Sequence, residues 1–324
     1  MYSVYGICNP LMDMVAYAGF DVLAALGATP GTMNLIDEGA RSTLLAKVRV
    51  ARMVPGGSGA NTLRGLSWLG GGEIEPPLFE GAVGRDEIGD RYERDLQALG
   101  VATRLARKNG GTGTSTIIVT PDHERTMFTC LAASRDYGEA DSCEPFPDCR
   151  WLYFTGYMWD TPNQRSAVAR CAEQARGRGV RVAFDVADPA AVRRYRDSFL
   201  EWIPGRVDVL FGNRQEMSLL VGERAGDREL AQAAGQLAPL AVIKTGADGC
   251  LVNDRGRIVA SPARPTKVVD TIGAGDFYAA GFLYGLLLGR PAAACSRVAN
   301  SIAAAVVGGC SVEQMDRGEV LRDW

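Results

Sequence analysis

Strand-like and helix-like segments alternate regularly from about residue 150 toward the C-terminus. Short runs rich in β-branched and aromatic residues indicate buried strands, and longer runs with helical spacing of apolar residues lie between them. Parallel strands need long crossover connections, which helices usually supply. The alternation therefore predicts an α/β fold with a doubly wound, mostly parallel sheet flanked by helices. The expected strands are residues 151–154, 180–185, 207–211 and 241–245, and the expected helices are residues 166–178, 190–202, 214–220 and 228–237.

The first half of the chain and its last third complete this pattern less regularly. No internal repeat or domain boundary is visible, so residues 1–324 are expected to form a single α/β domain, although a main domain with a smaller appendage fits the length equally. The further expected elements are a strand at residues 4–8, short helices or strands within 20–26 and 38–50, helices at 63–69 and 90–99, hairpins at 114–129 and 250–260, and helices beginning at 277 and 292.

Composition narrows the classes of ligand. The net charge is −3, from 35 basic and 38 acidic residues, so the chain lacks the basic surplus of a nucleic-acid or membrane-surface protein. Its N-terminus has no secretory pattern and no segment is apolar over the length of a bilayer, so we expect a cytoplasmic protein with a small-molecule substrate. A single histidine, His123, and eight cysteines without a Cys-x-x-Cys pair give little material for a zinc site or a Ser-His-Asp triad.

Residues 270–276, Asp-Thr-Ile-Gly-Ala-Gly-Asp, precede a long apolar run and suit phosphate chemistry. Small residues at Gly273, Ala274 and Gly275 let backbone N–H groups approach an oxyanion, and a helix starting there adds the positive end of its dipole. Asp276 can accept a hydroxyl proton beside that turn. The alternative interpretation is a helix start whose glycines serve packing and whose aspartate is a capping charge.

A second glycine-rich turn, Pro-Gly-Gly-Ser-Gly-Ala-Asn at residues 55–61, also opens onto an apolar helical run. Asp13 and Asn61 together can bind vicinal hydroxyls, because such a pair supplies an acceptor and a donor-acceptor. Gly56 and Gly57 would allow backbone amides to join them. The alternative is an Asx turn at Asp13 and a helix cap at Asn61.

Polar residues also follow the strands of the predicted parallel sheet, where ligands of open α/β sheets bind. Asn213 and Glu216 are three residues apart and could order magnesium-bound water, although a capping box explains the same spacing. Lys244 and the turn after it suit a nucleotide phosphate, although the lysine could equally extend from a sheet edge into solvent. Asp185 ends another expected strand.

These motifs together resemble the ribokinase-like (PfkB) family of ATP-dependent sugar and nucleoside kinases over essentially the whole chain. The specific signatures are Gly-Gly-Ser-Gly-Ala-Asn at 56–61 and the run at 270–276, in the family's order and spacing. Softer motifs at 9–13, 130–133, 153–157 and 207–213 are similar to adenosine kinases. Neither a Gly-x-x-x-x-Gly-Lys-Ser/Thr loop nor a dinucleotide-binding fingerprint is present in the sequence.

The resemblance implies a role for each motif. Asp276 would be the catalytic base, with an anion hole formed by the amides of Gly273, Ala274 and Gly275. Two segments, about 14–52 and 105–130, would form a small β lid from which Arg125 reaches the site. The implied acceptor-binding residues are Asn9, Asp13, Gly56, Gly57, Asn61 and Met158, and the implied nucleotide-binding residues are Asn213, Glu216, Thr245, Gly246 and Gly249, with Glu216 holding Mg²⁺ through water.

The activity implied is ATP- and magnesium-dependent phosphorylation of a nucleoside 5′-hydroxyl, with adenosine as the leading candidate. Met158 stands where adenosine kinases carry a purine-stacking aromatic, so Tyr157, Phe128 or Trp159 would have to supply that face. The nearest alternative is a sugar kinase similar to ribokinase or fructokinase. A non-catalytic nucleotide- or sugar-binding regulator is the second alternative. Adenosine kinases are often monomers and ribokinases often dimers, and both states fit.

Overall fold

The centre of the protein is a sheet of nine largely buried strands. The structure is a computed structural model that describes residues 1–142, 145–322 and 324. In sheet order these strands are β14 (Arg257–Ser261), β13 (Cys250–Asp254), β12 (Leu240–Lys244), β11 (Val209–Asn213), β10 (Arg181–Asp185), β9 (Cys149–Thr155), β1 (Tyr2–Ile7), β5 (Leu78–Gly84) and β6 (Ala102–Lys108). Neighbours run parallel from β12 to β6, whereas β13 is antiparallel to both β12 and β14.

Helices cover both faces of this sheet, so its strands alternate between two cores. Tyr153 of β9 belongs to one core, and its neighbours Leu152 and Phe154 belong to the other. The first core contains α3 (Ser58–Gly70), α4 (Glu87–Ala98), α9 (Ala274–Leu287), α10 (Ala292–Val307) and α11 (Arg317–Val320). The second contains α5 (Pro162–Gly177), α6 (Pro189–Trp202), α7 (Arg214–Val221) and α8 (Asp227–Ala234). The predicted doubly wound α/β fold is confirmed.

Two strands of the large sheet, β5 and the edge strand β6, were not among the expected elements. β5 contains residue types that strands usually avoid, since Glu80 is buried in it and accepts a hydrogen bond from the Tyr137 hydroxyl at 2.5 Å. A Cβ at Gly81 would lie 2.4 Å from the Cys8 carbonyl oxygen, so glycine is needed for the close approach of β1. Tertiary packing, and not local propensity, makes this segment a strand.

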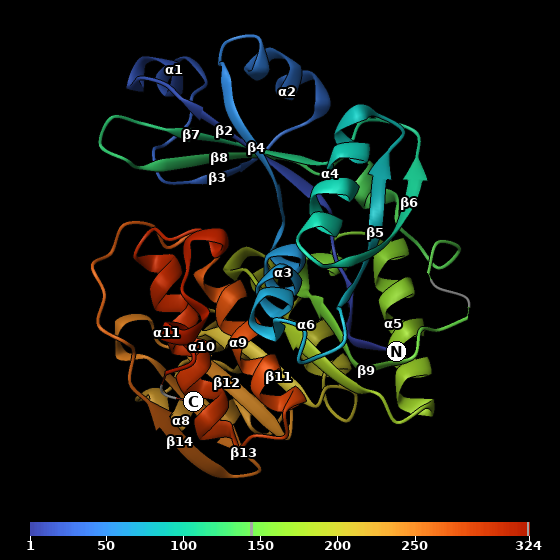
Figure 1. Ribbon diagram of the computed structural model, residues 1–324, viewed down its shortest axis with the longest axis vertical. Coiled ribbons are helices and arrows are strands. Elements are labelled where there is room, and N and C mark those ends of the chain that lie inside the picture. Colours follow the sequence, from blue (N-terminus) through green and yellow to red (C-terminus); the bar gives the residue numbers. More distant parts are fainter. Residues whose placement is uncertain (143–144, 323) are drawn as a thin grey trace.

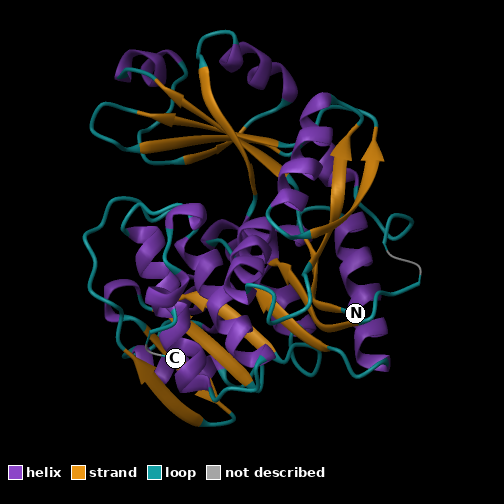
Figure 2. Cartoon of the chain, in the orientation of Figure 1, coloured by secondary structure: helices purple, strands orange, loops and turns teal. Residues whose placement is uncertain are grey.

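A smaller sheet lies over the large one, with α1 (Phe20–Ala25) and α2 (Glu38–Leu45) on its outer side (Figures 1 and 2). Its strands in order are β3 (Met33–Leu35), β8 (Arg125–Cys130), β7 (Thr114–Val119), β2 (Leu11–Tyr17) and β4 (Val50–Gly56). The expected hairpin at 114–129 is the antiparallel pair β7 and β8. The expected lid segment 105–130 begins too early, because β6 pairs with β5 in the large sheet.

The helix that begins at the 270–276 motif is apolar on all sides because α3, α10 and the sheet surround it. Glycines allow α9 and α10 to approach closely. A Cβ at Gly281 would lie 2.7 Å from the Cα of Ala299, and one at Gly285 would lie 2.6 Å from the Cys295 sulfur. Within the described ranges, none of the helices combines the length and the apolar character needed to cross a membrane.

We predict that Gly281→Ala destabilises the protein by about 1–3 kcal/mol, because the added methyl group overlaps the backbone of α10. Gly177→Ala is the matched control, since Gly177 is also helical but faces open space. That substitution should stabilise the protein by about 0.5 kcal/mol through helix propensity. Urea unfolding of both variants gives the two free energies, and equal stabilities would contradict the close packing of α9 on α10.

Candidate active site

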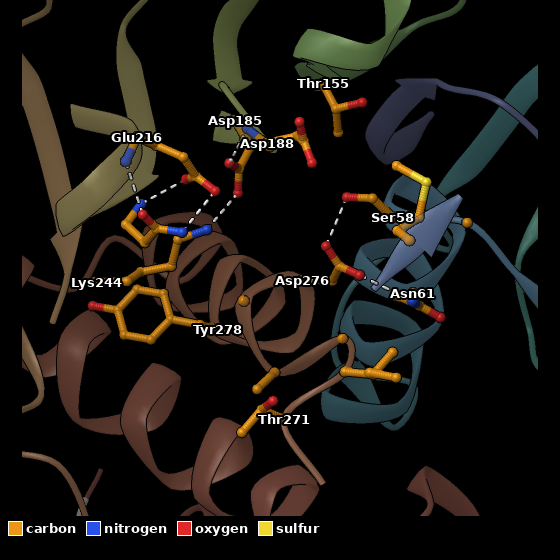
Figure 3. Close-up of a pocket in the computed structure, with 18 of the residues that line it drawn as sticks. Ser58, Asn61, Thr155, Asp185, Asp188, Glu216, Lys244, Thr271, Asp276 and Tyr278 are labelled. Carbon is orange, nitrogen blue, oxygen red and sulfur yellow. Dashed lines mark hydrogen bonds and ion pairs between the residues drawn. The ribbon is translucent and has the colours of Figure 1, made fainter. Parts of the chain in front are cut away.

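A cavity of about 920 Å³ lies between the two sheets, beyond the carboxyl ends of the large sheet's parallel strands. The chain reverses its direction of strand addition between β1 and β9, which is where open α/β sheets bind ligands. Most of the predicted site residues line this cavity (Figure 3). They are Asn9, Asp13, Gly57, Asn61, Asn213, Glu216, Gly246, Gly249, Gly273, Ala274, Gly275 and Asp276.

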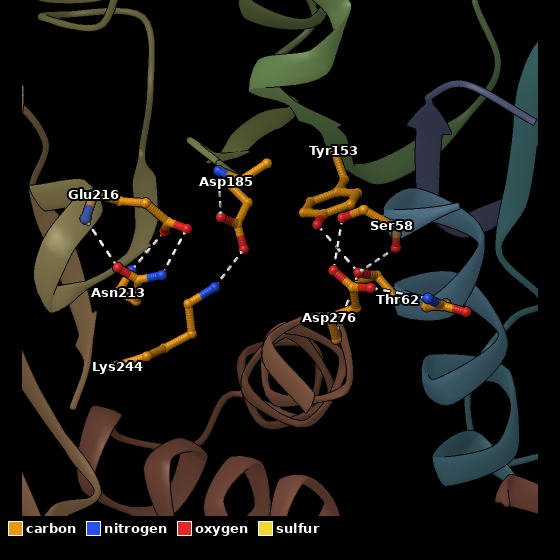
Figure 4. A network of polar contacts seen from close by, with 10 residues as sticks. Ser58, Thr62, Tyr153, Asp185, Asn213, Glu216, Lys244 and Asp276 are labelled. Atoms are coloured by element: carbon orange, nitrogen blue, oxygen red, sulfur yellow. Dashed lines mark hydrogen bonds and ion pairs between the residues drawn. The ribbon is translucent and has the colours of Figure 1, made fainter. Parts of the chain in front are cut away.

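Asp276, in the first turn of α9, is held by the first turn of α3. The Ser58 hydroxyl donates to Asp276 Oδ1 at 2.6 Å, and Asn61 Nδ2 donates to Oδ2 at 2.9 Å (Figures 3 and 4). The Thr62 hydroxyl donates to the Asp276 carbonyl oxygen at 3.2 Å. Asn61 was predicted to offer both a donor and an acceptor to a ligand. Its amide N–H instead orients the Asp276 carboxylate, so only its amide oxygen is left for a ligand.

Two glycines with positive φ bring these helix starts together. Gly57 caps α3 with φ 89°, and a Cβ there would lie 2.6 Å from the Asn9 carbonyl oxygen. Gly273 caps α9 with φ 76°, a left-handed conformation that side chains with a Cβ rarely adopt. Both signature runs therefore need glycine at these positions for the backbone itself.

Burial raises the pKa of Asp276 to about 6, and the negative charge of Asp185 adds to the increase. The hydrogen bonds from Ser58 and Asn61 act in the opposite direction and stabilise the carboxylate. A carboxylate with a pKa near neutrality can both accept and release a proton, which suits a general base.

The three residues of the predicted anion hole lie at the start of α9. Gly273, Ala274 and Gly275 all line the cavity at the N-terminus of the 14-residue helix α9, where the helix dipole favours an anion. The Ala274 amide donates to the Thr271 carbonyl oxygen at 3.2 Å, so it is already engaged in the turn. Gly275 N–H belongs to the first turn of the helix, whose amides lack intrahelical acceptors.

Asp13 and Asn9, both predicted to bind the acceptor, line one side of the cavity. A Cβ at Gly56 would lie 2.2 Å from the Asp13 carboxylate, so Gly56, predicted to contact the acceptor, instead makes room for Asp13. Asn9 Oδ1 accepts a hydrogen bond from the buried Gln164 Nε2 at 2.7 Å, which fixes the amide. Burial raises the pKa of Asp13 to about 7, Arg64 opposes this, and the charge of Asp276 adds to the increase.

The small sheet presents an apolar surface to the same side of the cavity. Met33 and Leu35 of β3, Ile117 of β7 and Met127 of β8 all line the cavity. Ser115 and Thr129 of the same strands contribute hydroxyl groups beside them. A ligand bound at Asp13 would therefore meet an apolar slot next to a polar clamp.

Asn213 and Glu216 form a capping box at the start of α7, as the alternative interpretation of their spacing expected. Glu216 Oε2 accepts from the Asn213 backbone N–H at 2.7 Å, and Oε1 accepts from Asn213 Nδ2 at 2.7 Å. Both residues nevertheless line the cavity. Burial raises the pKa of Glu216 to about 7, which Lys244 opposes.

Three predicted site residues, Gly56, Met158 and Thr245, do not line the cavity formed by the described residues. Met158 is fully buried in the core under the large sheet, beside Trp159 and Phe199, so its predicted contact with a substrate base is wrong. Tyr157, its neighbour, lines the cavity instead. Thr245 is 5% exposed and directly follows β12, and its hydroxyl has no partner among the described residues.

Several residues that line the cavity, or that hold a residue lining it as Gln164 holds Asn9, were not predicted as part of a site. Ser58 lies inside the 55–61 run, but the sequence does not indicate that its side chain points toward Asp276. Gln164 stands on α5, far from either signature. The apolar slot residues look like ordinary strand residues, because only the pairing of β3, β7 and β8 brings them together. In the described part of the chain, no group of three or more His, Cys, Asp or Glu residues could hold a metal ion.

Comparison with known proteins gives a family. Residues 22–314 match the family described as pfkB family carbohydrate kinase. The structure of adenosine kinase from Sinorhizobium meliloti is similar with a TM-score of 0.85 and 33% identity, covering 95% of this chain and 94% of that one. The structure of a probable sugar kinase from Rhizobium etli is similar with a TM-score of 0.88 and 30% identity, covering 99% and 97%.

A characterised sequence relative is also a kinase. The nucleoside kinase of Methanothermobacter thermautotrophicus is 26% identical over 293 residues, which are 89% of this chain and 90% of that protein. These similar proteins include an adenosine kinase, a nucleoside kinase and a probable sugar kinase. The similarities therefore support phosphotransfer to a nucleoside or a sugar and do not choose between the two.

We predict that Asp13→Asn stabilises the protein more at pH 8 than at pH 5. The folded-state pKa of about 7 lies above the ordinary 3.8, so the stability that Asp13 contributes by binding a proton is present below pH 4 and is lost as the pH rises through 7. Asparagine stays neutral throughout. The expected gain at pH 8 is on the order of 1 kcal/mol, or about 2 °C in Tm. Thermal unfolding at both pH values measures it, and an equal effect at each would contradict the prediction.

Proposed function

The chain belongs to the pfkB family of carbohydrate kinases, and on that premise we propose that it transfers the γ-phosphoryl group of ATP to the 5′-hydroxyl of a nucleoside, with adenosine as the leading candidate. The observation that carries the nucleoside proposal is the apolar slot of Met33, Leu35, Ile117 and Met127 beside Asp13. A nucleoside has an apolar base face next to vicinal ribose hydroxyls, whereas a free sugar is polar on every side. The slot and the clamp together fit the nucleoside better.

In the proposed reaction the acceptor hydroxyl lies between the clamp and the base. Its oxygen attacks the γ-phosphorus of ATP, the bond from that phosphorus to the β–γ bridging oxygen breaks, and ADP leaves with the electron pair. The hydroxyl proton passes to Asp276. Ser58 and Asn61 hold the carboxylate in place, and the amides at the start of α9 would stabilise charge on the transferring group.

In the proposed reaction, the small sheet excludes water from the cavity. An ion pair of 2.6 Å between Arg125 of β8 and Asp270 joins that sheet to the loop before α9. Residues of both sheets thus enclose the cavity on the acceptor side. Exclusion of water would strengthen the electrostatic interactions in the site and prevent hydrolysis of ATP.

The oxygen ligands of the site suit Mg²⁺ that arrives with ATP. Glu216, Asp185 and Asp188 present carboxylates to the cavity, and Glu216 is predicted to hold the ion through water. Mg²⁺ keeps several waters and binds through one or two carboxylates and substrate phosphates, so a site without a preformed cluster of ligands fits it. The bound ion would neutralise phosphate charge. Gly246 and Gly249 line the neighbouring part of the cavity, where the nucleotide is proposed to bind.

We predict that Asp276→Asn lowers kcat by about 10²–10⁴-fold while ATP binding changes little, because a general base acts in the transition state. Steady-state kinetics and calorimetric titration with ATP measure the two quantities. In the wild type, activity should fall as the pH drops through about 6, where Asp276 becomes protonated. Near-normal turnover by the variant would exclude Asp276 as the base.

Ser58→Ala should move that acid limb to higher pH. The hydrogen bond from Ser58 stabilises the Asp276 carboxylate, so its loss raises the pKa of the base. The pH profile of kcat/KM for both proteins measures the shift. Ser67→Ala is a suitable control, because Ser67 lies on the same helix and donates to the Gly100 carbonyl oxygen away from the cavity. An unshifted limb in Ser58→Ala would contradict the proposed orientation of the base.

A panel of acceptors tests the substrate class. We expect ATP-dependent ADP release with adenosine, and the panel adds inosine, guanosine, cytidine, ribose and fructose. Leu35→Asn should lower kcat/KM for the nucleoside about 10-fold or more and leave ribose unaffected, because Leu35 belongs to the apolar slot. Tyr17→Asn is the matched control, an exposed apolar residue of the same sheet outside the cavity wall. Turnover of ribose or fructose without any nucleoside would overturn the proposal in favour of a sugar kinase.

A further inference from the structure

Lys244 is a buried cation that the mechanism above does not use. It ends β12, and its Nζ lies 2.8 Å from Asp185 Oδ2 at the end of β10 (Figure 4). The side chain of Lys244 is 15% exposed and that of Asp185 is 2% exposed. Both residues line the cavity, so the ion pair lies in the wall of the proposed active site.

The ammonium group also lies against the first turn of α9. A Cβ at Gly275 would be 3.2 Å from Lys244 Nζ, so the glycine leaves the space that the lysine occupies. Figure 4 shows Lys244 and Asp276 on opposite sides of the start of this helix. An anion bound by the Gly275 amide would therefore have Lys244 on one side and the base on the other.

The other charges of the cavity wall favour a protonated Lys244 beside a bound anion. Asp13, Asp185, Glu216 and Asp276 are all acidic, and ATP brings further negative charge. Burial alone would lower the pKa of Lys244, but the nearby carboxylates of Asp185 and Glu216 outweigh it and raise the pKa above its ordinary value. The lysine therefore stays protonated at neutral pH.

Two other cations line the cavity, but each has a carboxylate partner of its own. Arg264 Nη2 lies 2.7 Å from Glu319 Oε1, and Arg194 Nη1 lies 3.6 Å from Asp160 Oδ1. Lys244 lies against Gly275 at the start of α9, and neither arginine makes this contact.

Asp185 is fixed independently of the lysine. Its Oδ1 accepts from the Ala187 amide at 3.0 Å, while Oδ2 accepts from Lys244. Ala187 has φ 71°, and the Asp188 amide donates to the Val186 carbonyl oxygen at 2.9 Å across it, which is a γ-turn. Such a conformation is rare for a residue with a Cβ and tends to persist at functional sites. It holds the Asp185 carboxylate where it can direct the ammonium group.

We propose that Lys244 is a catalytic residue that binds a non-bridging oxygen of the phosphoryl group during transfer, and that Asp185 is the positioning residue that holds it beside the anion hole. This inference rests on the proposed function. Lys244 exchanges part of its contact with Asp185 for the phosphate oxygen and keeps its proton throughout. The bonds made and broken remain those of the phosphoryl transfer, and the acceptor proton still goes to Asp276.

The first test is Lys244→Met in the full-length protein, with kcat and KM measured for ATP and for the accepted substrate. Loss of a charge-stabilising group that acts in the transition state should lower kcat about 10²–10³-fold and change the KM of the acceptor little. Lys108→Met is the matched control, because Lys108 forms a similar ion pair of 2.6 Å with Asp141 outside the cavity. We expect this control to keep wild-type turnover.

The second test is Asp185→Asn, read out as a pH profile. The amide keeps an oxygen for the Ala187 N–H but removes the charge that raises the pKa of Lys244, so the basic limb of kcat should move to lower pH. Glu216 of α7 and Asp276 of α9 also face the lysine and remain in this variant. A purely structural role of Asp185 would leave the basic limb in place.

The outcomes separate the two levels of inference. Turnover by the wild type with an unchanged kcat in Lys244→Met would overturn the role of Lys244 alone, whereas no turnover with any nucleoside or sugar would overturn the proposed function and this inference together. If melting shows that Lys244→Met is unfolded, Lys244→Gln decides, because glutamine can still donate to Asp185. We expect the same loss of kcat in that variant, and retained activity would refute the proposal.

Discussion

The hydrogen bonds from Ser58 and Asn61 to the Asp276 carboxylate connect two helix starts that are more than 200 residues apart in the chain. They are possible because α3 and α9 pack closely, and a Cβ at Gly65 would lie 2.7 Å from the Phe277 ring. Each signature run thus has two functions. It opens a helix toward the cavity, and it supplies the groups that orient the other helix's polar residue.

Buried carboxylates around this contact lower the stability of the folded protein, because burial disfavours their charged form. Burial raises the pKa of Asp13 and Glu216 to about 7 and that of Asp276 to about 6, so each is held in a folded state that disfavours its charge. Such groups persist where function needs them. The ion pair of Lys244 with Asp185 offsets part of this excess of negative charge.

The sequence predicted the doubly wound sheet and most of the polar cavity wall, because strand alternation and glycine-rich helix starts are local patterns. It did not indicate β5, where Glu80 and Gly81 are explained only by their contacts with Tyr137 and β1. It also placed Met158 in the site. A single-residue offset in the short turn after β9 decides whether a side chain enters the core or the cavity, and the structure puts Tyr157 toward the cavity.

The acceptor is the property that local motifs define least, for a physical reason. The proposed hydroxyl clamp, anion-binding helix start and carboxylate base would serve a ribose and a hexose equally well, and they lie within three short runs, residues 9–13, 55–61 and 270–276. Discrimination depends on what faces the rest of the acceptor, and those side chains come from β3, β7 and β8. Parallel pairing of β3 with β8 sets Leu35 opposite Thr129, so the slot depends on a register between distant segments. Under the proposed function, the packing of the small sheet determines the substrate class, and the two signatures supply the phosphoryl-transfer chemistry.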